Sequence, residues 1–166
     1  MVQLSKKVTL YFVVLFLLAG CVKTEMVKDD FQITEKHGFL VTNFHSSHSG
    51  YKVTIIKKSN LTTSSAIFDI KPDDNFWVIS IPEGEYTWRG IYVDTKHSEF
   101  RNEMDFKIES GKLNYIGDMV INISSDIETY TMGVLDQTEF AKERIEKDFP
   151  NLYERYRFVK NLTNDK

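Results

Sequence analysis

The stretch Met104-Asp105-Phe106-Lys107-Ile108-Glu109-Ser110-Gly111-Lys112-Leu113-Asn114-Tyr115 contains two segments of alternating polarity separated by a turn. Apolar side chains stand at positions 104, 106 and 108 with charged side chains between them, which is the period of a strand with one buried face. Leu113 and Tyr115 resume the alternation after Ser110-Gly111. The pattern predicts two antiparallel strands joined by a hairpin turn at Ser110-Gly111.

Segments of the same kind fill most of the chain after Gly38. Runs rich in valine, isoleucine, tyrosine, phenylalanine and threonine alternate with clusters of serine, asparagine, aspartate and glycine. β-Branched and aromatic residues favour strands, and the polar clusters favour turns. Strands are predicted over residues 39–44, 51–57, 66–71, 76–81, 86–94, 104–108, 113–123 and 127–135.

Two of these strands flank a second predicted hairpin at Ile81-Pro82-Glu83-Gly84-Glu85-Tyr86. Proline presets the backbone for a tight turn, and Gly84 accepts a left-handed conformation. In the strand before this turn, Phe76-Trp77-Val78-Ile79 is apolar on both parities, so we expect it to be covered on both faces rather than to lie at an edge. Trp77 and Trp88 are expected to pack in the core rather than to stack on a carbohydrate.

The hydrophobic period changes after Leu135. Asp136-Gln137-Thr138-Glu139 has the pattern of a helix-capping box, so a helix is predicted to begin there and to end at Pro150. Residues 152–160 are predicted to form a second short helix, with an extended segment as the alternative. One side of the first helix is apolar and should dock on the sheet; its residues are Phe140, Ala141, Ile145 and Phe149.

These elements predict a mainly β protein, with an antiparallel β-sandwich of about seven or eight strands and a C-terminal α-helical segment packed on it. The sandwich is assigned to residues 38–135 and the helical segment to residues 136–166. The stretch from Val22 to Asp30 is polar and charged without a regular period, which is typical of a flexible linker.

Residues 1–21 have the order of a bacterial signal peptide. Two lysines precede an apolar run from Val8 to Leu18, which is shorter than the roughly 20 residues that span a membrane. The run ends in Leu18-Ala19-Gly20-Cys21, which resembles the bacterial lipobox. The resemblance implies cleavage between Gly20 and Cys21, a diacylglyceryl thioether on Cys21 and a further acyl chain on the freed amine.

Cys21 is the only cysteine in the chain, so no disulfide can form within it. Lipidation explains a lone thiol in an exported protein; the alternative is an ordinary secretory signal cut beside a free cysteine. Two or three acyl chains anchor a protein stably in a membrane. We therefore expect a signal peptide in residues 1–20, and the lipidated cysteine with a flexible tether in residues 21–37. Val22 stands where inner-membrane lipoproteins carry aspartate, a resemblance that implies the outer membrane, facing the periplasm.

A second resemblance covers roughly residues 39–160. Pro82-Glu83-Gly84-Glu85-Tyr86 resembles the turn of PEGA-like and carboxypeptidase-regulatory-like (prealbumin-type) domains. Phe106, Gly111-Lys112 and Tyr115-Ile116-Gly117-Asp118 are similar to a stretch of bacterial lipoproteins of that shape. The resemblance implies a β-sandwich that serves as an adhesive or accessory module, and it brings no catalytic residue.

The charge and the motifs of the chain narrow its function. The net charge is −3 at pH 7 and becomes more negative when the two lysines of the signal peptide are removed. The chain has no basic stripe, so the sequence indicates no nucleic-acid partner. It also lacks the Gly-x-Ser-x-Gly, His-Glu-x-x-His and phosphate-loop motifs. We therefore expect no enzymatic activity and no cofactor beyond the covalent lipid on Cys21.

Two groups of residues are weak candidates for a chemical site. His45 and His48 lie close together in the sequence and would bind a metal only with a third ligand; the alternative is a loop with two solvated histidines. Asp73-Asp74 and Asp94 would act as a pair of carboxylates only if the fold brought them together.

Gly117-Asp118 marks a special position inside a predicted strand. A glycine there predicts a bulge or the close approach of another group. We expect Gly117 to make room for a ring such as that of Tyr86 or Trp88, and Asp118 to cap backbone amides; a ligand site is the alternative.

The sequence as a whole predicts a lipid-anchored, non-enzymatic envelope lipoprotein that acts as a binding or structural accessory module. Its partners would be the membrane, through the anchor, and an envelope protein or polymer. The expected contact surface is an edge or face of a sheet, or the aromatic segment of Tyr153, Tyr156 and Phe158 if it is exposed. The alternatives are a periplasmic immunity or inhibitor lipoprotein, a metal-dependent envelope hydrolase that uses His45 and His48, and a small-ligand binder.

Overall fold

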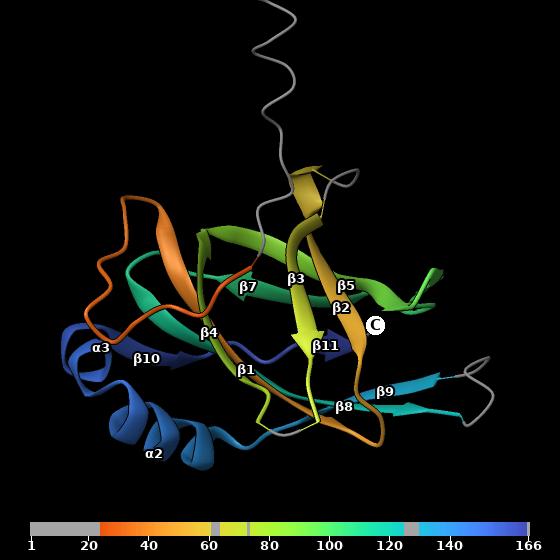
Figure 1. Ribbon diagram of the computed structural model, residues 1–166. Helices are drawn as coiled ribbons and strands as arrows, with labels where there is room; N and C mark the ends of the chain where they lie inside the picture. The colour runs from red at the N-terminus through yellow and green to blue at the C-terminus, as the bar shows by residue number, and fades with distance from the viewer. Residues whose placement is uncertain (1–23, 61–63, 73, 125–129, 166) are drawn as a thin grey trace, which may run out of the picture.

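The computed structural model describes residues 24–60, 64–72, 74–124 and 130–165, so the lipobox with Cys21 lies outside it. The described chain is mainly β, with two helices near its C-terminus (Figure 1). The elements are β1 (His37–Ser46), β2 (Tyr51–Lys57), the 3-10 turn η1 (Lys58–Asn60), β3 (Ser64–Ile70), β4 (Phe76–Pro82), β5 (Gly84–Val93), β6 (Lys96–Glu99), β7 (Met104–Ile108), β8 (Lys112–Ile123), β9 (Tyr130–Leu135), α2 (Thr138–Asp148), α3 (Pro150–Arg155), β10 (Arg157–Lys160) and β11 (Asn164–Asp165). Each of the eight predicted strands corresponds to one of these, whereas β6 and β11 were not predicted and β10 falls in the stretch for which an extended segment was the alternative.

The strands form two sheets. Sheet A has the order β10-β8-β1-β4, and β9 also pairs with β8. Sheet B has the order β11-β7-β5-β2-β3, and β6 also pairs with β5. Sheet B is antiparallel, but β1 and β10 both run parallel to β8. The prediction of a wholly antiparallel arrangement is therefore wrong for sheet A, because alternating polarity marks a strand without stating the direction of its neighbour.

Both predicted hairpins are wrong, because each of these turns links one sheet to the other. Ser110-Gly111 follows β7 of sheet B and precedes β8 of sheet A, and Glu83 lies between β4 of sheet A and β5 of sheet B. Gly111 and Gly84 have positive φ angles of 69° and 145°, as the sequence led us to expect for turns. The hydroxyl of Tyr86 donates to the carbonyl of Pro82 at 2.6 Å and so holds the second corner closed.

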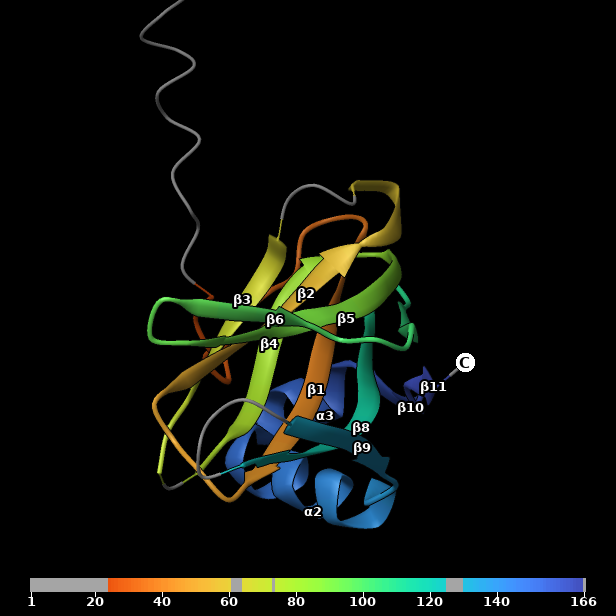
Figure 2. The ribbon, with the colours of Figure 1, turned by 90° about the vertical axis from the view of Figure 1, so that its right-hand side faces the viewer.

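A large hydrophobic cluster contains side chains of both sheets, and Figure 2 shows the strands of the two sheets crossing in front of and behind one another. Trp77 of sheet A and Trp88 of sheet B belong to this cluster, as predicted. The ring of Phe68 lies 5.5 Å from that of Trp77 and 5.7 Å from that of Trp88, so aromatic contacts connect the sheets.

A second hydrophobic cluster lies between the other face of sheet A and the helices; Figure 1 shows α2 at the bottom and α3 at the left, beside β10. Phe76 and Val78 of β4 belong to it, while Trp77 and Ile79 face the first cluster. The prediction that this strand is covered on both faces is confirmed. It lies nevertheless at the edge of sheet A, where the amide of Val27 donates to the carbonyl of Val78 at 2.9 Å.

The segment from Thr24 onward, predicted as part of a flexible tether, is held on the folded body. Thr24 accepts a hydrogen bond from the amide of Ile67 in β3 at 2.8 Å, and Val27 is buried against β4. Asp29 accepts from the amides of Asn151 and Leu152 at the start of α3, at 2.9 and 3.2 Å. The segment thus contacts both sheets and the helices. The prediction of a flexible linker is therefore wrong for this stretch, because the side chains of Thr24 and Asp29 accept hydrogen bonds from backbone amides of the folded body.

The C-terminal helices agree in part with their prediction. Ala141, Ile145 and Phe149 are buried beneath sheet A, but Phe140 is 49% exposed. The capping box forms only in part: Oδ1 of Asp136 accepts from the amide of Thr138, the first residue of α2, at 3.2 Å, whereas Glu139 pairs with Lys142 at 3.0 Å. The second short helix and its extended alternative both occur, as α3 followed by β10. No helix in the described part of the chain is long and apolar enough to cross a membrane.

Candidate functional site

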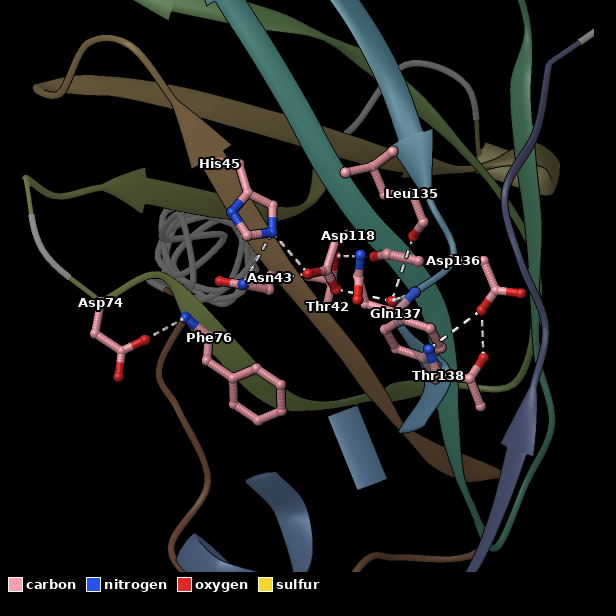
Figure 3. Close-up of polar contacts among 12 residues, drawn as sticks. Thr42, Asn43, His45, Asp74, Phe76, Asp118, Leu135, Asp136, Gln137 and Thr138 are labelled. Carbon is pink, nitrogen blue, oxygen red and sulfur yellow. Dashed lines mark hydrogen bonds and ion pairs between the residues drawn. The ribbon is translucent and has the colours of Figure 1, made fainter. Parts of the chain in front are cut away.

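The most elaborate polar cluster in the described residues lies where β1 and β8 run side by side (Figure 3). Val41 pairs with Tyr115 and Asn43 with Asp118, so β8 carries one additional residue between these pairs. Gly117 has a φ of 98° at this bulge, and its carbonyl accepts from the hydroxyl of Thr42 at 2.8 Å. The predicted bulge is therefore present.

The bulge changes which face of sheet A each residue of β8 occupies. Before it, Tyr115 faces the helices; after it, Met119 faces sheet B. The additional residue shifts the alternation by one, and so Asp118 joins Tyr115 on the helix-facing side. Gly117 does make room for a neighbour, but this is Val134 of β9 rather than an aromatic ring. A Cβ atom at Gly117 would lie 2.4 Å from the Cγ1 atom of Val134.

Asp118 is the centre of the cluster, and its side chain is only 1% exposed. Its Oδ2 atom lies 2.7 Å from Nε2 of His45 and 3.3 Å from Nδ2 of Asn43. Its Oδ1 atom accepts a hydrogen bond from the hydroxyl of Tyr115 at 2.8 Å. Three side chains therefore donate to one buried carboxylate, which compensates for its removal from water. The prediction that Asp118 caps backbone amides is wrong.

Tyr115 connects this carboxylate to the beginning of α2. Its hydroxyl oxygen accepts from the amide of Gln137 at 2.9 Å while it donates to Asp118. Burial, together with the hydrogen bond to Asp118, raises the pKa of Tyr115 above its usual value. The phenol therefore keeps its proton, and remains a donor to the carboxylate, at a more alkaline pH than an exposed tyrosine would.

The two histidines that were weak metal candidates, His45 and His48, have different partners in the structure. The side chain of His45 is 48% exposed and pairs with Asp118, while His48 lies beside the hydroxyl of Ser47 at 2.9 Å. No group of three histidine, cysteine, aspartate or glutamate side chains suited to a metal occurs in the ranges that the structure covers. An imidazole oriented by a carboxylate is also the arrangement of a general base.

The carboxylates of the other candidate pair serve different parts of the fold. Asp74 accepts from the amide of Phe76 at 3.1 Å and forms an ion pair with Arg144 of α2 (Figure 3 draws the first contact). Asp94 stands in the turn between β5 and β6, where its φ is 52°. Asp73 lies outside the described residues. The structure brings Asp74 to the helix layer and leaves Asp94 at a turn of sheet B.

The aromatic segment predicted as a contact surface packs against the helix-facing cluster. The ring of Tyr156 contacts that of Phe39 at 4.9 Å, and the ring of Phe158 stacks on Tyr115 at 6.1 Å. Tyr153 is half-buried beside them. The large apolar side chains that are most exposed in the described chain are instead Met26, Phe31, Leu135 and Phe140.

Two open hollows lie away from the Asp118 cluster. One, of about 490 Å³, lies between β7 and the segment that leads from β10 to β11. The other, of about 720 Å³, lies beside the two corners that connect the sheets. Both linings contain lysines together with acidic side chains, and neither includes His45 or Asp118.

The sequence identified His45 and Asp118 separately but not as a pair. They lie 73 residues apart, and they meet only because β1 runs parallel to β8 and the bulge turns Asp118 toward the helix-facing side. Asn43 and His45 are two residues apart and so lie on the same face of β1, but this spacing did not indicate that β8 is the partner strand. Comparisons of the chain with protein-family models, curated proteins and solved structures found no match.

Proposed function

We propose that this chain is a lipid-anchored β-sandwich of the cell envelope, and that it works by binding another envelope protein rather than by catalysis. The sequence Leu18-Ala19-Gly20-Cys21 supports the anchor. The two sheets with a shared hydrophobic cluster support the sandwich, on which the helices form a third layer. The turn at Pro82–Tyr86, which the Tyr86 hydroxyl closes, is consistent with the resemblance to PEGA-like domains.

The arrangement of the Asp118 cluster favours a structural role for it. Each carboxylate oxygen of Asp118 receives a donor from the protein, and the Tyr115 hydroxyl is engaged on both sides. These contacts stabilise the bulge and fix the start of α2 on sheet A. These donors already occupy the carboxylate, which favours a structural over a catalytic role for Asp118.

The observation that carries the binding function is the free edge of β9. Within the described residues β9 pairs with β8 alone, and no backbone hydrogen bond reaches its other edge. The strand Tyr-Thr-Met-Gly-Val-Leu contains no charge and no proline, the residues by which proteins usually protect an edge from further pairing. An extended segment of a partner would add to this edge through main-chain hydrogen bonds.

Two exposed apolar side chains lie at and shortly after the end of β9 in the sequence. Leu135 at the end of β9 is 45% exposed, and Phe140 in the first turn of α2 is 49% exposed. Both residues belong to the segment that leads from sheet A to the helix layer. Because each side chain is already about half buried, its complete burial on binding would contribute on the order of 1 kcal/mol, before the cost of association.

Site-specific photocrosslinking in intact cells tests this function. A photoreactive amino acid at position 135 or 140 should give one reproducible adduct with another envelope protein, and L135D/F140D should abolish partner binding. Glu146 on the same helix is exposed and has no ion pair among the described residues, so a crosslinker there and the substitution E146K serve as matched controls. Adducts only with a second copy of the chain, or equal adducts at position 146, would contradict the proposal.

A further inference from the structure

The distance along the chain from the proposed anchor to the folded body is very short. Thr24 is the first described residue, and its hydroxyl already accepts from the amide of Ile67 at 2.8 Å. Only Val22 and Lys23 separate it from Cys21. Three residue steps span at most about 10 Å when fully extended. The predicted tether of residues 21–37 would have allowed the body a much wider range of positions.

The attachment at Thr24 is part of a longer series of contacts. Val27 is hydrogen-bonded to β4 and buried, and Asp29 caps α3 through two backbone amides. Release of Thr24 alone would therefore lengthen the connection only as far as Val27. The whole segment would have to leave both sheets and the helix layer before the body could move away from its anchor.

The N-terminal end of the attached segment determines which side of the molecule lies nearest the proposed anchor. Thr24 contacts β3, which is the edge strand of sheet B. The helix α2 lies on the opposite side of sheet A, two layers away (Figure 1). Packed layers are separated by about 10 Å each, so the β3 edge and the outer side of α2 differ by about 20 Å in their distance from the anchor.

We propose that the body is docked directly on the lipid headgroups of its own membrane, with the β3 edge of sheet B toward the bilayer and α2 away from it. This inference rests on the lipidation of Cys21 in the proposed function. The headgroup region is about 5–7 Å thick on each side of the hydrocarbon core, so a leash of at most about 10 Å leaves an aqueous gap of no more than about 3–5 Å, too narrow for a freely moving domain. Exposed groups next to Thr24, namely Glu25, Met26 and Ser65 of β3, would contact the headgroups.

Fluorescence quenching by lipids tests this orientation in the intact lipoprotein. Because acylation consumes the only native thiol, S65C and E146C each supply a single labelling site, one on β3 and one on α2. The lipidated proteins are reconstituted in vesicles of phosphatidylethanolamine and phosphatidylglycerol that contain a headgroup-nitroxide lipid. The label at position 65 should lose most of its emission, and the label at position 146 should retain it.

A lengthened leash supplies the second arm of the experiment. Insertion of about 20 glycine and serine residues before Thr24, with an r.m.s. length of about 25 Å, should restore the emission at position 65. The acyl mass of each preparation is measured in parallel. Equal emission at the two positions in a protein with its acyl chains overturns the docking but leaves the anchor intact. Quenching that persists after the insertion also overturns the short leash, whereas a chain without acyl groups overturns the proposed function itself.

Discussion

Asp118 is a buried carboxylate of sheet A that is hydrogen-bonded to three side chains. It is nearly inaccessible to water and accepts hydrogen bonds from Tyr115, Asn43 and His45. Burial of a charge is costly unless donors replace the lost water, and here three side chains do so. His45 is the exposed member of the group, so it contributes less to folding than the buried donors do.

D118N should lower the free energy of unfolding by about 2–3 kcal/mol, because the buried donors lose a charged acceptor. H45Q should lower it by less than about 1 kcal/mol, since half of the histidine side chain is already in water. Urea denaturation of the two variants and the wild type at pH 7.5 measures both values. If H45Q were as destabilising as D118N, the exposed ion pair rather than the buried network would hold this part of the fold.

The buried phenol of Tyr86 should make the stability of the protein depend on pH under alkaline conditions. Burial raises the pKa of Tyr86 to about 12 from its usual value near 10. Between these values the unfolded chain has lost the phenolic proton while the folded chain keeps it, so the group's stabilisation is complete below pH 10 and is lost as the pH rises through 12. The loss amounts to about 1.4 kcal/mol per pH unit for this group.

Y86F should therefore lower stability by about 1 kcal/mol at pH 8, where it removes the hydrogen bond to Pro82. Its stability should then decline less steeply than that of the wild type between pH 10 and 12. Denaturation curves at pH 8, 10 and 11 give both quantities. An unchanged slope in Y86F would show that Tyr86 does not keep its proton in the folded state.

At the scale of the secondary-structure elements, the bulge in β8 decides which side chains meet. The sequence predicted a bulge or a close approach at Gly117, and a uniform alternation through β8 would place Met119 on the same face as Leu113 and Tyr115. The bulge moves Met119 to the face opposite Tyr115. The local sequence contained the signal for the bulge, but its effect on the two faces depends on the register between β8 and β1.

Replacement of Gly117 tests whether this bulge is required. G117A should destabilise the protein by about 2 kcal/mol or more, because a side chain is strained at a φ of 98° and the new Cβ meets Val134. G133A in the neighbouring strand is the matched control: a Cβ there meets nothing within 4 Å, and the change should be within about 0.5 kcal/mol of neutral. A similar cost for both variants would contradict this interpretation.

The strand segments themselves were predictable, whereas their partners were not. Met104, Phe106 and Ile108 are buried with a partly or fully exposed residue between them, as the alternation predicted. The turn residues after them were also identified, but a glycine turn can join two strands of one sheet or carry the chain from one sheet to another. Which of these occurs at Ser110-Gly111 depends on the pairing of β7 with β5, which lies far away in the sequence.

At the scale of the whole molecule, the mainly β character and the C-terminal helices followed from hydrophobic periodicity. The order of the strands, the parallel pairing of β1 with β8, and the attachment of the segment at Thr24 did not. Each of these depends on contacts between distant residues that no local pattern contains. The Asp118 cluster was missed for the same reason, since its members come from two strands and the start of a helix.

If Cys21 is lipidated as proposed, the attached N-terminal segment would hold the molecule in a fixed relation to its anchor, so the docking proposal depends on the chemistry of Cys21. The free edge of β9 would be presented to partners that approach a membrane-bound body. If the anchor were absent, β9 could still bind a partner, but nothing would hold the β3 edge toward the bilayer.

The most direct test of the central claim is the intact mass of the chain extracted from the membranes of its own cells, together with the mass of C21S. We predict that the wild-type chain begins at Cys21 and carries a diacylglyceryl group with a further acyl chain. C21S should lack both the cleavage and the acyl groups and should leave the lipoprotein fraction. A wild-type chain with a free thiol at Cys21, or one recovered without acyl chains, would contradict the account.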